Sequence, residues 1–143
     1  MKTDANIFLN VFRIYAKTEM APWLSEVIAP SLVLTGEQDG GCNPRLNKFI
    51  ADNLKNSKLT AFGMTKKAGR SADNDPGISA ILNSNTSSVC LVGKTWDFHV
   101  DVALGISKEE NLENIRESAK HFIKENKEFM FDAEHFFDGY KAN

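Results

Sequence analysis

Cysteine is scarce in this sequence: Cys42 and Cys90 are the only two among 143 residues. Two cysteines without a secretory context make no disulfide framework, and no second pair of cysteines completes a zinc site. We therefore expect two free thiols, buried or unreactive, and neither a disulfide nor a metal centre built on cysteine.

Long apolar runs and an excess of one charge are also missing. No segment approaches the roughly 20 apolar residues of a membrane span, and the first residues, Met1 to Asp4, lack a signal peptide's apolar core. The formal net charge is −2, with 42% hydrophobic and 25% charged residues. This composition is typical of one soluble globular domain. We expect a cytoplasmic protein with neither a membrane nor a nucleic-acid partner.

The sequence does contain a regular alternation of helical and strand patterns. Helices are predicted near 5–17, 44–54, 76–82 and 107–124, and strands near 31–36, 58–67, 88–93 and 129–134. The alternation predicts an α/β fold of about four parallel strands with right-handed crossovers. Two architectures fit it, half of a TIM barrel or a small open, flavodoxin-like sheet. No linker divides the chain, so residues 1–143 are expected to form a single domain.

The predicted helices carry start signals and apolar faces. Asn43 precedes Pro44, Asp75 precedes Pro76, and Ser107 opens a capping box with Glu110. Apolar residues at helical spacing predict one apolar stripe on the first helix and core-facing stripes on the others. The stripes are Ile7, Phe8, Val11, Phe12 and Tyr15; Leu46, Phe49, Ile50 and Leu54; Ile78, Ile81 and Leu82; and Leu112, Ile115, Ala119, Phe122 and Ile123.

The segment Glu128 to Asn143 is the most informative, because a strand pattern runs directly into acids, a histidine and aromatics. Period-2 alternation places Phe129, Phe131 and Ala133 on one face and Met130, Asp132 and Glu134 on the other. Ligands bind at the carboxyl ends of parallel strands, so this strand end is a candidate site. The same run is also typical of a solvated strand end with no function.

Three strand-end segments of the chain resemble the citramalate synthase branch of the pyruvate-carboxyltransferase-like barrel enzymes, whose relatives include isopropylmalate and homocitrate synthases. They are Lys58-Leu-Thr-Ala-Phe-Gly-Met-Thr-Lys-Lys67, Val92-Gly-Lys-Thr-Trp-Asp-Phe-His-Val100 and Phe131-Asp-Ala-Glu-His-Phe-Phe-Asp-Gly-Tyr-Lys-Ala-Asn143. In that family they are similar to the third, fourth and fifth strands of a TIM barrel. The resemblance covers residues 56–143.

The resemblance implies a transferase that condenses acetyl-CoA with an α-keto acid such as pyruvate, in branched-chain amino-acid biosynthesis. It implies that Glu134 contacts the keto acid and that Trp96, Asp97, His99 and His135 lie at the mouth of the barrel. The family's metal ligands, an Asp-x-x-Leu-Arg-Asp-Gly motif and a His-x-His pair, are absent from this sequence.

The histidines that the sequence does contain, His99, His121 and His135, are scattered along the chain. No two of them stand at ligand spacing within one element. We therefore expect no cofactor, and Mg²⁺ or Mn²⁺ bound no more tightly than about millimolar.

Residues 1–55 resemble a different family, the late part of an α/β-hydrolase. The resemblance rests on the pattern Pro-x-Leu-Val-Leu-x-Gly-x-x-Asp, which residues Pro30 to Asp39 match. The resemblance implies that Asp39 orients a catalytic histidine. However, neither a Gly-x-Ser-x-Gly nucleophile turn nor a following histidine is present. Asp39 is therefore predicted to be a vestigial acid, and no esterase activity is expected.

Lys66, Lys67 and Arg70 form a small basic patch in a glycine-containing loop. Such a patch suits a phosphate or a CoA tail, but it is more typical of a solvated loop.

Two functions fit these observations. The first is a non-catalytic folded fragment or chimera, joined near residues 43–57, that carries incomplete parts of both families. The second is a citramalate-synthase-type acyltransferase fragment that binds an α-keto acid or acetyl-CoA and needs a partner chain for the metal site. Four strands leave two open sheet edges, so a homodimer is expected for a half-barrel and a monomer for an open sheet.

Overall fold

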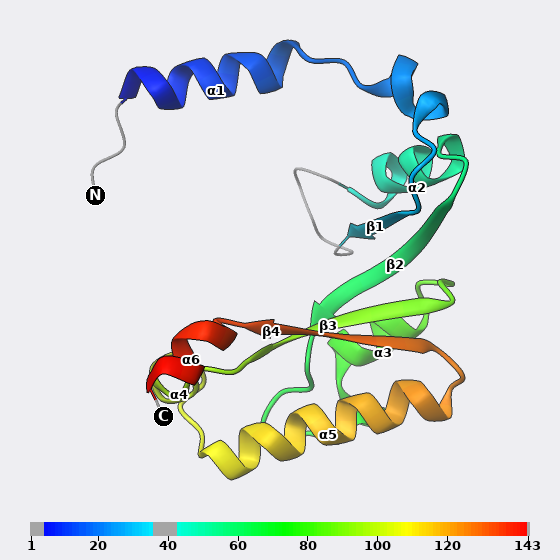
Figure 1. Cartoon of the computed structure of the whole chain (residues 1–143). Coiled ribbons are helices and arrows are strands. Elements are labelled where there is room, and N and C mark those ends of the chain that lie inside the picture. Colours follow the sequence, from blue (N-terminus) through cyan, green and yellow to red (C-terminus); the bar gives the residue numbers. More distant parts are fainter. Residues whose placement is uncertain (1–4, 36–42, 143) are drawn as a thin grey trace.

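The computed structural model describes residues 5–35 and 43–142. Within them, four strands form one parallel sheet in the order of the chain (Figure 1). The strands are β1 (Ser31–Thr35), β2 (Ser57–Met64), β3 (Ser88–Lys94) and β4 (Glu128–Glu134). A flavodoxin-like sheet places its first strand inside the sheet, whereas β1 lies at an edge here. The fold is therefore a curled half-barrel, the first of the two predicted architectures.

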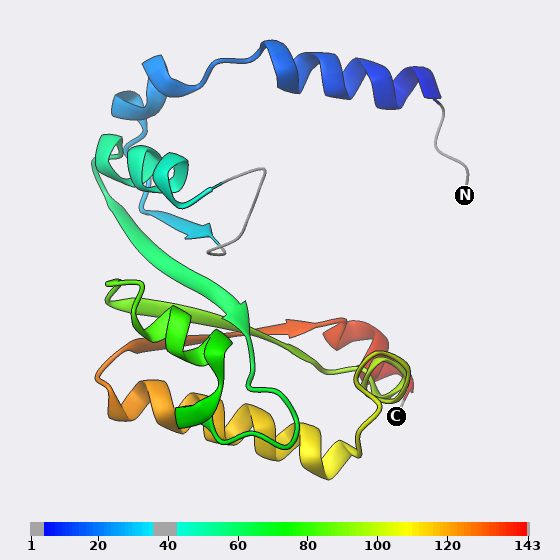
Figure 2. The same ribbon diagram turned by 180° about the vertical axis from the view of Figure 1, so that it is seen from behind.

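A helix precedes each strand: α1 (Ala5–Lys17), α2 (Pro44–Asn53), α3 (Pro76–Leu82) and α5 (Lys108–Lys124). The remaining helical segments are η1 (Ala21–Glu26), η2 (Ala72–Asn74), α4 (Asp97–His99), a π-helix η3 (Val100–Leu104) and α6 (Phe136–Ala142). In both Figure 1 and Figure 2, α3 and α5 lie on the same side of the sheet, while α4 and α6 lie at the carboxyl ends of β3 and β4.

The register of the strands assigns each residue to a face. Thr60 pairs with Ser88, and Ser88 with Glu128, and the Thr60 hydroxyl donates a hydrogen bond of 3.0 Å to the Ser88 hydroxyl. Three layers further along, Lys94 pairs with Glu134 and their side chains form an ion pair. These side chains belong to the concave face, which would line the inside of a barrel. The predicted alternation of β4 is confirmed, because Phe129 packs against the core on the opposite face.

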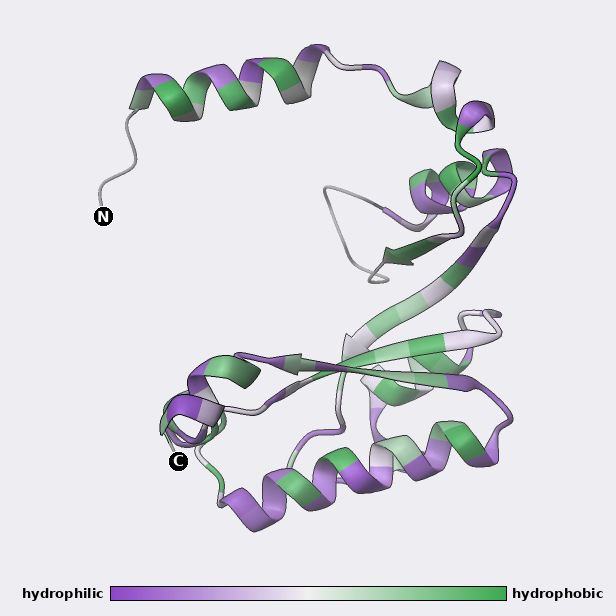
Figure 3. Cartoon of the chain, viewed as in Figure 1, coloured by the Kyte–Doolittle hydropathy of each residue, from purple (hydrophilic) through white to green (hydrophobic). Residues whose placement is uncertain are grey.

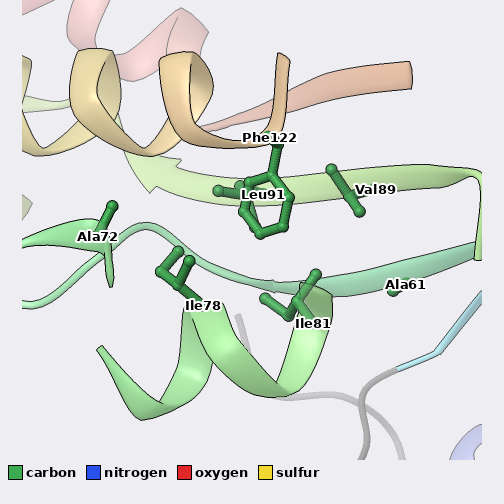
Figure 4. Close-up of a cluster of buried hydrophobic side chains, with 7 residues drawn as sticks. All are labelled: Ala61, Ala72, Ile78, Ile81, Val89, Leu91 and Phe122. Atoms are coloured by element: carbon green, nitrogen blue, oxygen red, sulfur yellow. The ribbon is translucent and has the colours of Figure 1, made fainter. Parts of the chain in front are cut away.

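The hydrophobic core lies between the convex face of the sheet and helices α3 and α5 (Figure 4). Its buried members are Ala61, Ala72, Ile78, Ile81, Val89, Leu91 and Phe122. Val89 and Leu91 are two residues apart on β3 and therefore point to the same face of the sheet. Ile78 and Ile81 are about one helical turn apart on α3 and face the same core from the other side. The predicted inward positions Ile78, Ile81 and Phe122 are thus confirmed, whereas Ile115 and Ala119 of α5 are only half-buried.

Other apolar residues that were predicted to face the core are exposed. Leu46 and Phe49 of α2 and Leu112 and Ile123 of α5 are exposed, so their predicted burial is wrong for the single chain. Ile7 and Val11 of α1 are exposed as well, on a helix that extends away from the sheet (Figure 3). Helical spacing marks a face as apolar, but it does not tell what covers that face.

The loop before α3 is held by one buried carboxylate. Asp75 caps the helix by accepting hydrogen bonds from Gly77 N (2.8 Å) and Ile78 N (3.1 Å), and it also accepts one from Lys67 N (2.9 Å). Burial acts to raise the pKa of Asp75, but these three backbone donors, with Arg70 nearby, lower it below its ordinary value.

Asp75 should therefore make folding pH-dependent. A lowered pKa means that the carboxylate stabilises the fold above its ordinary pKa near 4, and that this contribution is lost as the pH falls through the lowered value. We expect Asp75→Asn to lower the free energy of unfolding by about 1–3 kcal/mol at pH 7, with a smaller difference at pH 3. Urea unfolding at both pH values checks this, and an equal difference at both would contradict it.

Candidate active site

The carboxyl ends of β3 and β4 bring a lysine and a glutamate together. Lys94 Nζ donates a hydrogen bond to Glu134 Oε2 across the paired strands. This hydrogen bond lowers the pKa of Glu134, against the opposing effect of burial, and the charges of Lys94, His135 and His99 lower it further. Glu134 is therefore an ionised carboxylate at neutral pH, held beside a cation.

Backbone pairing continues past the strands and fixes the residues that follow. Thr95 donates to Glu134 O through its backbone N–H (3.2 Å) and its hydroxyl (2.7 Å). His135 then adopts a left-handed conformation, with a φ of 59°, between β4 and α6. Few residues other than glycine adopt this conformation, and it occurs often at functional sites.

Two histidines from different strand ends meet at this place. The rings of His99 and His135 lie edge to face with centroids 4.4 Å apart, and Trp96 lies 4.9 Å from His99 and 5.9 Å from His135. His135 Nδ1 is 2.8 Å from Asp138 Oδ2. His99 Nδ1 is buried and has no hydrogen-bond partner among the described residues.

The three histidines are scattered along the sequence and were not expected to meet. The fold nevertheless brings His99 and His135 into contact. His121 remains apart, on α5, where its Nδ1 lies 3.5 Å from Asp73 Oδ1. The signal was present in the sequence, because both site histidines follow strands that become neighbours in a parallel sheet. Strand order, which local patterns do not contain, was the missing information.

Asp97, the other acid predicted at the mouth, contacts the start of α5 through Lys108. Its carboxylate lies 3.3 Å from Lys108 Nζ and accepts a hydrogen bond from Phe98 N (2.8 Å). The hydrogen bond from Lys108 is the main cause that lowers the pKa of Asp97. Asp97 therefore braces the start of α5 against α4.

Two residues of this site were missed by sequence reasoning, Lys94 and Asn111. Lys94 is the cation of the central ion pair, and Asn111, buried on α5, donates a hydrogen bond of 2.9 Å to Lys94 O. The register position of Lys94 opposite Glu134 identifies it, but only once the strands are paired.

Helix α6 closes one side of the site by direct backbone contact. Gly139 is buried, and a Cβ there would overlap Thr95 O and crowd Trp96 Cα. Backbone atoms cannot turn aside as a flexible side chain does. The glycine therefore allows α6 to pack against the residues that follow β3.

We expect Gly139→Ala to lower the free energy of unfolding by about 1–3 kcal/mol, because α6 must move off Thr95. The same shift should change the near-ultraviolet circular dichroism of Trp96. Exposed Lys141 on the same helix provides the control, since Lys141→Ala should change stability by less than about 0.5 kcal/mol. Equal stability of the glycine variant and wild type would show that α6 is not packed as described.

The side chains that the structure describes do not form a site for a divalent metal. No group of three histidine, cysteine, aspartate or glutamate side chains within residues 5–35 and 43–142 is arranged to hold one. Asp132 lies one layer below Glu134 on the concave face, beside Cys90. Cys90 is a buried free thiol, and burial raises its pKa, with Asp132 raising it further. Cys42 and Asp39, which was predicted to be a vestigial acid, lie outside the described residues.

The predicted basic patch is not an open anion site. Lys66 is buried, and its Nζ contacts Glu117 Oε2 (2.9 Å) and Arg70 O (2.7 Å). Its backbone N–H also donates to Ser118 Oγ (2.9 Å). Lys66 therefore fastens its loop to α5, and only Lys67 and Arg70 are exposed.

Comparison with known proteins gives no match to a protein-family model and no significant match to a solved structure. The chain is similar to curated proteins named (R)-citramalate synthase. It is 43% identical to that of Aquifex aeolicus over 105 residues, and 43% identical to that of Geobacter sulfurreducens over 107 residues. It is 38% identical to that of Streptomyces coelicolor over 108 residues. These matches cover 71–72% of this chain and 20% of each relative.

The chain thus spans about a fifth of the length of the curated relatives it matches. Residues 56–143 alone are a smaller share of the chain than the matched part, so the similarity begins before residue 56 and reaches back into α2. The synthase resemblance is confirmed for that part. The hydrolase resemblance, and with it a junction of two families, finds no support here and stays a prediction.

No helix in the part of the chain that the structure describes is long and apolar enough to cross a membrane. The predicted cytoplasmic location goes further than this finding and stays a prediction.

Proposed function

We propose that the carboxyl-end site of β3 and β4 binds an α-keto acid, as part of a citramalate-synthase-type acyltransferase. The Lys94–Glu134 pair beside the His99–His135 pair is the observation that carries the proposal. It lies in strand-end segments that resemble the synthase family, and the similarity to citramalate synthases supports that family as the source of the site.

The chemistry of the site suits a small keto acid. Such a ligand is an anion whose carboxylate and keto oxygens only accept hydrogen bonds. Lys94 carries three N–H donors, and the ring nitrogens of His99 and His135 supply further donors. Glu134 takes one donor of Lys94 and so fixes the direction of the ammonium group. Because Lys94 is largely buried and Glu134 is partly buried, the pair is shielded from competing water.

Condensation with acetyl-CoA needs more than this site. By family resemblance the reaction requires a divalent metal, and the described residues do not supply its ligands. We therefore propose keto-acid binding for this chain, and the complete acyl transfer only together with a second chain that provides the metal site. The competing hypothesis, a non-catalytic fold, assigns the same residues to a structural network at the strand ends.

Calorimetric titration with pyruvate separates the two hypotheses. We expect saturable binding without added metal, and much weaker binding of propionate, which has the carboxylate but lacks the keto oxygen. Addition of acetyl-CoA and Mg²⁺ should release no free CoA from this chain alone. The proposal fails if pyruvate gives no saturable signal, or if propionate binds equally well.

A further inference from the structure

His135 and Asp138 form a pair of the kind that prepares a histidine to accept a proton. Asp138 Oδ2 lies 2.8 Å from His135 Nδ1, three residues further along the chain. A carboxylate only accepts hydrogen bonds, so the neutral imidazole carries its proton on Nδ1 and donates it to Asp138. Its Nε2 then has a lone pair, and this nitrogen has no hydrogen-bond partner among the residues that the structure describes. Nε2 is therefore the ring atom that is left to take a proton from a ligand.

Neighbouring groups hold the ring of His135 in one orientation. The ring of His99 meets it edge to face with centroids 4.4 Å apart, and the ring of Trp96 lies 5.9 Å away. The left-handed backbone of His135 turns the chain from β4 into α6, the helix that carries Asp138. A histidine that is oriented by a carboxylate and by packing is the arrangement of a general base in enzymes.

This pair lies directly beside the ion pair of the proposed keto-acid site. His135 follows Glu134, whose carboxylate accepts a hydrogen bond from Lys94 Nζ. The charges of His135 and His99 lower the pKa of Glu134, which means that both rings lie close to that carboxylate. The ends of β3 and β4 thus place a cation, which can hold a ligand oxygen, next to an oriented base.

We infer that this site removes a proton from the carbon next to the keto group of a bound α-keto acid. The activity is enolisation, and the inference rests on the proposed keto-acid binding. His135 is the general base, and Asp138 is the positioning residue that orients it. Lys94 stabilises the charge that forms on the keto oxygen. This exchange of a proton uses neither acetyl-CoA nor an oxidant.

With pyruvate as the ligand, the lone pair of His135 Nε2 takes a proton from the methyl carbon. The two electrons of that C–H bond form a double bond to the keto carbon, and the π electrons of the carbonyl group move to its oxygen. The products are an enolate and an imidazolium that still donates from Nδ1 to Asp138. The reverse step returns a proton from Nε2 to the methyl carbon. Because N–H protons exchange with solvent, the hydrogen returned in heavy water is a deuteron.

Lys94 is suited to the charge that develops on the keto oxygen. It carries three N–H donors, of which Glu134 takes one. Its backbone is fixed by pairing with β4 and by the hydrogen bond of 2.9 Å that Asn111 donates to Lys94 O. Its side chain is only 18% exposed, so water weakens its interaction with a negative oxygen little. Donors that are held in place before the charge forms contribute strongly to catalysis.

The alternative is that Asp138 and His135 only stabilise the turn into α6. The chain contains a second histidine–aspartate pair for comparison, in which His121 Nδ1 lies 3.5 Å from Asp73 Oδ1. His121 lies on α5 and Asp73 on η2, apart from the ends of β3 and β4. Asp73→Asn is therefore the matched control for Asp138→Asn.

Proton nuclear magnetic resonance of pyruvate in heavy water tests the inference on the 143-residue chain. Wild type should exchange the methyl protons at least about tenfold faster than buffer alone. At saturating pyruvate, Asp138→Asn should lower this rate at least about tenfold and keep the pyruvate dissociation constant within about twofold. His135→Asn, which suits the left-handed backbone, should lower the rate to that of buffer. Asp73→Asn should change neither the rate nor the affinity.

The same measurements separate this inference from the proposed function. Wild type that binds pyruvate in calorimetry but does not exchange its methyl protons would overturn enolisation and leave keto-acid binding intact. Wild type that does not bind pyruvate would overturn both. Exchange that persists in His135→Asn would assign the base elsewhere. Equal losses of rate in Asp138→Asn and Asp73→Asn would show that Asp138 acts only on the fold.

Discussion

Replacement of Phe122 by alanine is expected to lower the free energy of unfolding by about 3–5 kcal/mol. The Phe122 side chain is completely buried and joins α5 to the sheet through Val89, Leu91 and their neighbours. Alanine would leave a cavity at the layer that holds the half-barrel together. Since domains of this size are stable by about 5–15 kcal/mol, the loss is a large fraction of the total.

Urea unfolding followed by circular dichroism measures this change. Phe137, on α6, is the matched control, because its ring is 73% exposed. Phe137→Ala should change the free energy of unfolding by less than about 0.5 kcal/mol. Similar losses in the two variants would mean that the layer at Phe122 is not the core.

The second large effect concerns ligand binding. We expect Lys94→Met to weaken pyruvate binding at least tenfold, or about 1.4 kcal/mol. Methionine keeps most of the side-chain volume but removes the cation and its donors, and it leaves the Glu134 carboxylate to repel the anionic ligand. Calorimetry of wild type and variant gives the ratio of dissociation constants.

The chain offers a matched control at the other end of the same face. Lys58 pairs with Glu128 across the sheet, near the amino ends of the strands. Lys58→Met removes the same charge from an ion pair that reaches from β2 to β4 across β3, away from the proposed site. It should leave pyruvate affinity within about twofold of wild type. If both variants lose affinity equally, the effect reflects overall charge and not the site at Lys94.

Local features of the fold were predictable because they depend on neighbours in sequence. Asn43 accepts a hydrogen bond from Leu46 N and Ser107 accepts one from Glu110 N, as expected of helix caps. The period-2 pattern of β4 correctly separated Phe129 from Glu134. Each of these inferences needs only about four consecutive residues and a known backbone geometry.

The choice between half-barrel and open sheet could not be made in this way. Both folds contain the same alternating helices and strands, and they differ only in where β1 pairs. That pairing is a long-range property, decided by packing of the whole sheet. The predicted burial of apolar residues on α2 and α5 was wrong for a related reason. Helical spacing identifies an apolar face, but the elements that would cover that face are set by long-range packing.

The residues of the site were predicted from the sequence, but the contacts between them were not. Glu134, Trp96, His99 and His135 were all expected at the mouth, and the structure brings these four residues together. The contact between the two histidines depends on the order of β3 and β4 and on the left-handed turn at His135. Neither the strand order nor the left-handed conformation of His135 can be recognised from the spacing of residues in a sequence motif.

The chain's own histidines provide the most direct measurement of keto-acid binding at this site. Two of them, His99 and His135, lie in it, and His121 lies apart on α5. In a nuclear magnetic resonance titration with pyruvate, the ring signals of His99 and His135 should shift and saturate together while those of His121 stay unchanged. Signals that do not move, or that move equally for all three histidines, would contradict binding at the carboxyl ends of β3 and β4.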